Sequence, residues 1–156
     1  MATPTSLPAT FVAGNVLTAA QMNDLRGAFR ILQVVNDYDT STISTSSTSL
    51  VASNASVTIT PSAATSKILL IGSVYACRSN TVDADVYFAL DRDGTTVSAE
   101  TRFTEARTNA RNSVTFVYLD SPASTSALAY TLEWRVSSGT GTVENAHSIT
   151  ALEISA

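Results

Sequence analysis

Apolar and polar residues alternate with a period of two along most of the chain after residue 31. Alternation of this kind is typical of β-strands that turn one face to a core and the other to solvent. The segment SKILLIGSVYACR differs, because it is nearly apolar on both faces, and this predicts a central strand. In LAYTLEWRVS the alternating apolar side chains are Tyr130, Leu132, Trp134 and Val136.

Turn residues separate these segments. Pro61 ends ASVTITP, an Asp93-Gly94 pair lies in the hairpin predicted for ADVYFALDRDGTTVSAE, and Ser121-Pro122 follows NSVTFVYLD. About seven to nine strands joined by turns predict a mainly β protein, an antiparallel β-sandwich of jelly-roll-like type. The side chains predicted to face the core in these segments are Val57, Ile59, Val86, Phe88, Leu90, Val114, Phe116 and Tyr118.

The chain before residue 32 follows a different pattern. Pro4 and Pro8 disfavour a helix in the first 13 residues, which we predict to be an extended arm. Thr18 and Gln21 form a Thr-x-x-Gln capping box, so one short α-helix is predicted to begin there. We expect it to end near Arg30, whose positive charge suits a helix C-terminus.

One side of the predicted helix carries an apolar seam. Its members are three or four residues apart, as are the a and d positions of a coiled coil: Met22, Leu25, Phe29 and Leu32, with Leu17 before the cap. Isolated helices shorter than about 12–15 residues are marginal, so the seam needs a packing partner. Two partners fit, the chain's own sandwich and the same helix of sister subunits. The predicted division is therefore an arm and helix over residues 1–31 and a β-sandwich over residues 32–156.

Composition and charge narrow the class of protein. Ser and Thr make up more than a quarter of the chain, and only 14% of its residues are charged, against 44% hydrophobic residues. This balance favours a folded protein over a disordered one. The net charge of −4, with Lys67 as the one lysine, provides no basic surface for nucleic acid. No apolar run reaches the length of a membrane span, so we predict no membrane insertion.

Candidate chemistry is sparse. His147 is the single histidine and Cys77 the single cysteine; neither belongs to a catalytic motif, and Cys77 is predicted to be a small buried thiol. Asp91 and Asp93 resemble the start of a calcium loop, but Arg102 stands where such a loop has its twelfth-position Glu. A hairpin turn explains the same residues. We predict no catalytic residue, no metal site and no cofactor, and a protein that is not an enzyme.

Two stretches resemble virion proteins of tailed bacteriophages. The stretch FVAGNVLTAAQMNDLR is similar to an N-terminal segment of that family, in which Gly-x-x-(Leu/Val)-Thr-Ala-Ala-x-x-Asn opens fibre, minor tail or decoration proteins. The stretch ITPSAATSKILLIGSV resembles the Ser-Lys-Ile-Leu strand of their β-sandwich heads. The resemblance covers positions 10–32 and 32–75, and the C-terminal half matches in general pattern only.

The resemblance implies a structural protein of the virion, commonly a homotrimer, whose N-terminal segment attaches to other virion proteins while the sandwich projects outward. Together with the apolar seam, this makes the predicted residues for oligomerisation or attachment Leu17, Met22, Leu25, Phe29 and Leu32. The chain has no shaft or repeats between helix and head, which favours a stubby spike or a capsid decoration over a long tail fibre.

Three functions fit the sequence. The first is a trimeric surface fibre or spike that displays the head for host attachment, with a host surface glycan as a candidate ligand. The second is a decoration protein, a cement or head fibre, that stabilises the capsid. The third is a carbohydrate-binding module, which needs exposed aromatic side chains. The aromatic residues available for it are Tyr38, Tyr75, Tyr87, Tyr118, Tyr130 and Trp134.

Overall fold

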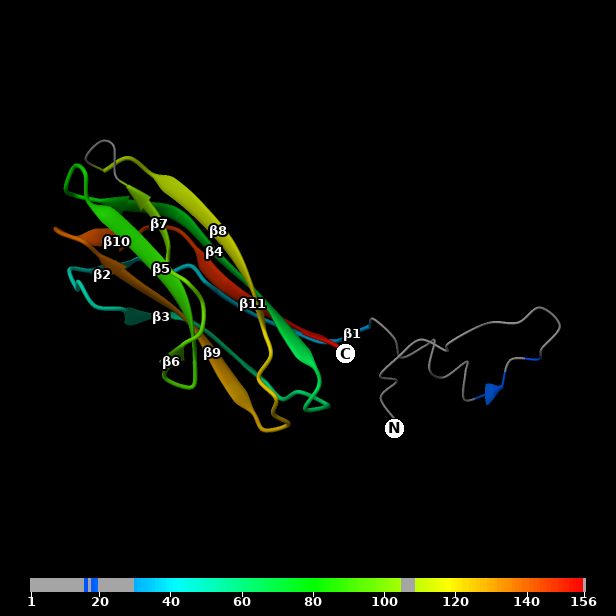
Figure 1. Cartoon of the computed structure of the whole chain (residues 1–156). Helices are drawn as coiled ribbons and strands as arrows, with labels where there is room; N and C mark the ends of the chain where they lie inside the picture. The colour runs from blue at the N-terminus through cyan, green and yellow to red at the C-terminus, as the bar shows by residue number, and fades with distance from the viewer. Residues whose placement is uncertain (1–15, 17, 20–29, 105–108, 156) are drawn as a thin grey trace.

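The computed structural model describes residues 16, 18–19, 30–104 and 109–155. Over these residues the chain forms eleven strands in two antiparallel sheets that pack face to face (Figure 1). This confirms the predicted antiparallel β-sandwich. The predicted arm and most of the predicted helix, residues 1–15 and 20–29, lie outside the described residues.

The larger sheet, called sheet A below, contains six strands. Its strands are β1 (Ile31–Asp39), β11 (His147–Ile154), β4 (Lys67–Ser79), β8 (Asn112–Asp120), β10 (Gly141–Val143) and β2 (Ile43–Thr45). Strand β4 lies at its centre: β8 pairs with one edge, and β11 and then β10 pair with the other. The prediction of a central strand in this segment is confirmed.

The smaller sheet, sheet B, contains five strands. They are β3 (Val51–Ile59), β9 (Leu128–Val136), β5 (Asp85–Arg92), β6 (Thr95–Thr96) and β7 (Thr101–Thr104). Eight main strands remain when the short strands β2, β6 and β10 are left out: β1, β3, β4, β5, β7, β8, β9 and β11. If these are numbered 1 to 8 in chain order, their order is 1-8-3-6 in sheet A and 2-7-4-5 in sheet B. This is the strand order of a jelly roll, so that part of the prediction is confirmed as well.

The core lies between the two sheets and consists of the side chains predicted from the alternation. In β9 every second side chain is buried, and the outward ones between them are partly exposed. The ring of Trp134 stacks on that of Phe88, with centroids 6.2 Å apart. Phe116 covers Gly72 on the neighbouring strand, where an added Cβ would lie 2.6 Å from the ring. A larger residue at this position would displace the ring.

The short strands β7 and β10 were not predicted as separate elements. Each has four residues or fewer, which is too short for alternation to stand out from the surrounding polar sequence. Strand β1 begins at Ile31, next to the predicted boundary, while the division into an arm with a helix and a sandwich stays a prediction.

Removing the central ring of the core should be costly. We expect Trp134→Ala to lower the free energy of unfolding by about 3–5 kcal/mol, because the side chain is 2% exposed and its loss leaves a cavity. Urea unfolding followed by far-ultraviolet circular dichroism measures the change. The control is Val82→Ala, at a half-exposed loop position, which should cost less than about 1 kcal/mol. Equal losses in the two variants would contradict the core assignment.

Candidate functional site on the outer face of sheet A

Four aliphatic side chains form a row across the outer face of sheet A. Val34 pairs with Leu152, Leu152 pairs with Leu69, and Leu69 pairs with Leu119. Paired residues of adjacent strands point to the same face, with Cβ atoms about 4.5–5.5 Å apart. Because the residues on either side of each position along its own strand are less exposed and turn toward the core, the row faces away from the core.

Further aliphatic side chains extend this row along the strands. Ile71 pairs with Val117 on one side of the row, and Ile31 pairs with Ile154 on the other. Together these residues are called the outer patch: Ile31, Val34, Leu69, Ile71, Val117, Leu119, Leu152 and Ile154. Val117 is 61% exposed and Ile31 and Val34 are each 57% exposed, so much of the patch meets solvent in the single chain.

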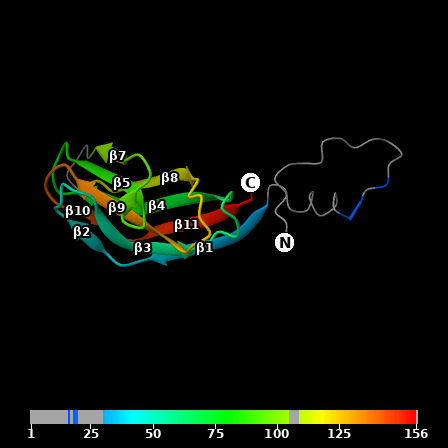
Figure 2. The same cartoon turned by 60° about the horizontal axis from the view of Figure 1, so that its bottom comes forward.

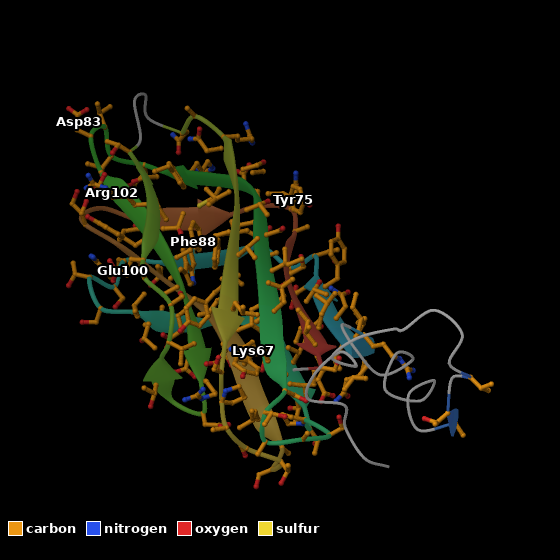
Figure 3. The ribbon with its side chains drawn as sticks, turned by 45° about the vertical axis from the view of Figure 1, so that its right-hand side comes forward. Lys67, Tyr75, Asp83, Phe88, Glu100 and Arg102 are labelled. Atoms are coloured by element: carbon orange, nitrogen blue, oxygen red, sulfur yellow. The ribbon has the colours of Figure 1, made fainter. Side chains whose placement is uncertain are left out.

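The border of the outer patch is polar but almost uncharged. Asn36 donates a hydrogen bond to the Thr150 hydroxyl, 2.8 Å away, and the hydroxyls of Ser73 and Thr115 lie 3.2 Å apart. Lys67 stands at the edge, where its ammonium donates to the Ser121 hydroxyl (Figure 3). A contiguous apolar surface with such a border is typical of a protein-contact site.

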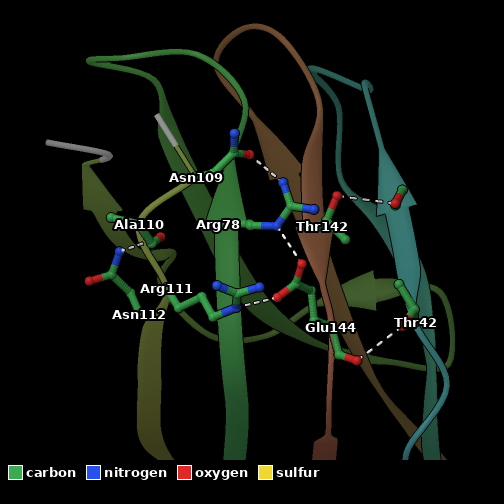
Figure 4. A network of polar contacts seen from close by, with 9 residues as sticks. Thr42, Arg78, Asn109, Ala110, Arg111, Asn112, Thr142 and Glu144 are labelled. Atoms are coloured by element: carbon green, nitrogen blue, oxygen red, sulfur yellow. Dashed lines mark hydrogen bonds and ion pairs between the residues drawn. The ribbon is translucent and has the colours of Figure 1, made fainter. Parts of the chain in front are cut away.

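The opposite end of the same outer face carries charge. Arg78 donates through Nε to one carboxylate oxygen of Glu144, 2.7 Å away, and Arg111 donates to the other (Figure 4). Arg78 also donates to the side-chain oxygen of Asn109. The hydrogen bonds from the two guanidinium groups hold the pKa of Glu144 below its ordinary value. The outer face is therefore divided into an apolar half and a half held by ion pairs.

Of the predicted attachment residues, the structure describes Leu32 alone. Leu17, Met22, Leu25 and Phe29 lie outside the described residues, and their role stays a prediction. Leu32 lies in β1, where the strand pairing shifts by one residue, and it is half-buried. The helical spacing therefore does not continue to Leu32, because a strand has already begun.

The start of β1 is tied to the end of the chain. The Arg30 amide donates to the Ser155 hydroxyl, and the Ser155 amide donates to the Arg30 carbonyl, each over 2.9 Å. Residue 30 thus lies beside the C-terminal end of β11, next to the Ile31–Ile154 end of the outer patch. The predicted N-terminal segment therefore leads directly into the border of this surface.

The outer patch was missed in the sequence because it exists only across strands. Within β1 or β8 its members look like ordinary solvent-facing positions between core residues. The sequence does contain one signal of the outer patch. Apolar residues occur at both odd and even positions in four segments, LQVVNDYD, SKILLIGSV, NSVTFVYLD and SITALEIS. Strands with apolar side chains on both faces indicate a second covered face.

The residues considered for chemistry serve the fold. Asp91 and Asp93 accept hydrogen bonds from the amides of Gly94 and Ala129, each over 2.9 Å, at the tip of the hairpin. Asp93 and Gly94 have φ of 51° and 85°, the left-handed values that a two-residue hairpin turn requires. The hairpin interpretation is confirmed. Cys77 is fully buried, as predicted.

Within the described ranges, no group of three or more His, Cys, Asp or Glu side chains lies together in a way that could hold a metal ion. The described residues also contain no helix long and apolar enough to cross a membrane.

Most of the aromatic side chains are not available to a ligand. Trp134 and Tyr130 are buried, and the Tyr87 ring is covered by the guanidinium of Arg135, 3.6 Å from its centroid. Tyr38 and Tyr75, on β1 and β4, are the large aromatic side chains that stand exposed in the described part of the chain. Tyr75 is labelled in Figure 3.

Comparisons with known proteins show a similar fold in solved structures but no relative in sequence. No protein-family model matches the chain, and no curated protein matches it in sequence. Solved structures with a similar fold include latent PorU from Porphyromonas gingivalis, with a TM-score of 0.51 and 11% identity over 82% of this chain. Two others are from infectious bursal disease virus, each with a TM-score of 0.50. The VP2 subviral particle is 18% identical over 79% of this chain, and the Gt strain structure is 14% identical over 95%. The chain spans 13%, 33% and 42% of these three proteins.

Removing metal ions with a chelator should not change the thermal stability of the protein. We expect EDTA not to change the melting temperature, because the carboxylates of Asp91 and Asp93 already accept backbone hydrogen bonds without a metal. Differential scanning calorimetry with EDTA and with added calcium measures this. A large loss of stability in EDTA that calcium restores would contradict the prediction.

Proposed function

We propose that this chain is a non-enzymatic structural protein of a virus particle and that it assembles through the outer patch. The outer patch is the observation that carries the proposal. Six of the eight exposed large hydrophobic residues of the described chain lie on sheet A. Fully burying one aliphatic side chain contributes about 1.5–3 kcal/mol, so covering even part of this surface favours association strongly.

The size of the outer patch fits the centre of an interface. Adjacent strands lie about 4.8 Å apart, so the four-residue row is about 14 Å wide. A stable interface removes about 800 Å² from each partner, which is more than this row provides. The polar residues around the patch, among them Asn36, Ser73 and Thr115, would complete the contact as its rim.

The partner we propose is a second copy of the chain, in a homotrimer. The net charge of −4 makes copies repel each other, but the outer patch is free of charged side chains apart from Lys67 at its edge. Copies can therefore meet there without bringing like charges together. Support for three copies comes from the resemblance of residues 11–26 to bacteriophage virion proteins, together with a closed ring as the usual form of such assemblies.

The attachment we propose uses the N-terminal segment. The seam of Leu17, Met22, Leu25 and Phe29 precedes β1, which starts at the border of the outer patch. A short amphipathic helix at that place can pack beside the assembled heads or on another virion protein, and it gains stability in either case. Two of the three fold-level neighbours above are from infectious bursal disease virus, one of them a subviral particle, which agrees with a place in the virion.

Two variants of this proposal differ in where the particle carries the trimer. A short fibre or spike on the tail or head would present its far end to the host, including a surface glycan. A capsid decoration protein would hold neighbouring capsid subunits together. Electron microscopy of particles labelled at the C-terminus distinguishes them. The carbohydrate-binding alternative depends on Tyr38 and Tyr75, the exposed aromatic side chains of the described region.

A charge placed in the outer patch should dissociate the assembly. We expect Leu119→Asp to raise the trimer dissociation constant at least about 30-fold, because a buried carboxylate without a partner costs more than about 2 kcal/mol. Sedimentation equilibrium measures the change.

Val82→Asp is the matched control, since Val82 is as exposed as Leu119 but lies in the loop between β4 and β5. It should assemble like the wild type. A wild-type protein that is monomeric at all concentrations, or a Leu119→Asp variant that assembles normally, would refute the proposed interface.

Deleting the N-terminal segment should separate folding from attachment. We expect a chain without residues 1–29 to keep its β circular dichroism spectrum, because the core begins with β1 and Arg30 still pairs with Ser155. Its incorporation into particles should be lost and its trimer weakened, as measured by co-sedimentation with particles and by sedimentation equilibrium. An insoluble or molten product would show instead that the segment covers its own sandwich.

A further inference from the structure

Strand β1 is an edge strand with a polar inner side. In sheet A it pairs with β11 alone, and across the sandwich it lies against β3 (Figure 2). Its core-facing positions are Gln33, Val35, Asp37 and Asp39, of which Val35 alone joins the apolar core. Besides its ladder with β11, the strand is therefore held on its inner side largely by polar contacts at its two ends.

A buried carboxylate holds the first end. Glu153 on β11 is fully buried and accepts hydrogen bonds from the Gln33 side chain and from the amide and hydroxyl of Ser62, each over 2.7 Å. Gln33 also donates to the Thr60 carbonyl over 2.7 Å. Burial by itself raises the pKa of Glu153, but the hydrogen bonds that the carboxylate accepts outweigh it and hold this pKa below its ordinary value.

At the second end, Asp37 links β1 to β3, and a buried histidine lies opposite Asp39. Asp37 accepts a hydrogen bond from the Ser56 amide on β3 over 2.9 Å, and Asp39 accepts one from the Ser41 amide over 2.5 Å. His147, opposite Asp39 in the strand pairing, is fully buried, and neither of its ring nitrogens has a hydrogen-bond partner among the described residues. An imidazole in this position is tolerated only while it is neutral, because a buried charge needs a partner.

The pKa values of His147 and Asp39 are both lowered in the fold, for different reasons. Burial lowers the pKa of His147, and the nearby Asp39 and Asp37 oppose that effect without cancelling it. The hydrogen bonds from Ser41 lower the pKa of Asp39. The other inward titratable side chains on the packed strands are Cys77 on β4, Tyr118 and Asp120 on β8, and Tyr130 on β9. The described part of β3 contributes no titratable group.

We propose that β1 is an acid-releasable strand, which separates from β11 and β3 on acidification while the rest of the sandwich keeps its fold. The released strand exposes His147 and Glu153 to water, where each takes up a proton more readily than in the closed sandwich. The remaining strands keep the core, because Trp134, Phe88 and their neighbours belong to β4, β5 and β9.

The pH window follows from the direction of each shift. His147 has a lowered pKa in the fold, so its contribution is complete above its ordinary value of 6.5 and is lost as the pH falls below that value. Glu153 also has a lowered pKa, so its contribution is lost further down, below its ordinary value of 4.5. The strand should therefore loosen in two steps, the first due to the histidine.

Release of β1 would also weaken the proposed assembly of the chain. The strand carries Ile31 and Val34 of the outer patch and connects the N-terminal segment to the head. Acid would then remove part of the interface and free the attached segment from the sandwich. This consequence rests on the proposed function, whereas the release itself does not.

Hydrogen exchange on the full-length protein tests the release. We expect the protection factors of β1 amides, corrected for the intrinsic effect of pH on exchange, to fall between about pH 7.5 and about pH 5.5, with a further fall below about pH 4.5. Amides of β5 and β9 should keep their protection, and the fluorescence of Trp134, the single tryptophan, should not change. A β1 that keeps its protection at all these values, or loses it in step with β9, would overturn the proposal.

Two variants identify the groups responsible. His147→Leu removes the buried titrating ring and should abolish the first step, and Glu153→Gln should lower β1 protection at neutral pH and flatten the second step. Glu144→Gln is the matched control, because Glu144 is also a hydrogen-bonded carboxylate but its side chain bonds to Arg78 and Arg111 rather than to β1, and it should leave both steps unchanged. If His147→Leu does not fold, the pH profile of the wild type and the Glu153→Gln variant still test whether β1 is released.

Repeating the measurement with Leu119→Asp separates this inference from the proposed function. Acid release of β1 in both proteins, without any trimer in the wild type, would support the release and refute the assembly. A wild-type trimer whose β1 stays protected in acid would refute the release alone.

Discussion

The contact between Phe116 and Gly72 sets the register of β8 against β4, the central strand of sheet A. Strand β4 carries apolar side chains on both faces, so burial alone does not decide which face turns inward. The ring of Phe116 on β8 needs a neighbour without a side chain, and Gly72 is the residue paired with it. With that pair in place, Leu70 and Val74 enter the core while Leu69 and Ile71 face outward. The pairing of Leu69 with Leu119 and of Ile71 with Val117 in the outer patch follows from this register.

The fold was predictable from the local pattern of apolar and polar residues, but the outer patch was not. Period-two alternation can be recognised within a single strand. The core positions of β3, β5, β8 and β9 were therefore predictable from the sequence, and their burial confirms them. The outer patch needs four strands in register. Val34 and Leu119 are far apart in the sequence, and no pattern within either segment indicates that Leu69 and Leu152 lie between them. The attachment seam proposed for residues 17–29 lies outside the described residues and stays a prediction.

The polar groups inside the sandwich show two ways of burying a carboxylate. Asp120 accepts hydrogen bonds from the Tyr130 hydroxyl and from Arg92, each over 2.6 Å, so a cation from sheet B neutralises it and joins the two sheets. The carboxylate of Glu153 accepts hydrogen bonds from neutral donors, Gln33 and Ser62. The first arrangement links strands that hold the core, and the second links an edge strand to its neighbour. Protonation therefore has very different consequences at the two places.

The pairing of Arg30 with Ser155 places both ends of the sandwich at one point, and this determines how the head responds to mechanical load. A force that pulls the N-terminal segment away from the far end of the head acts along β1. It therefore strains the whole ladder between β1 and β11, from Ile31–Ile154 to Asp39–His147, at the same time. A force between the two termini would open the same ladder from one end, one pair after another. A head held through its N-terminus alone therefore resists shear far better than one held by both ends.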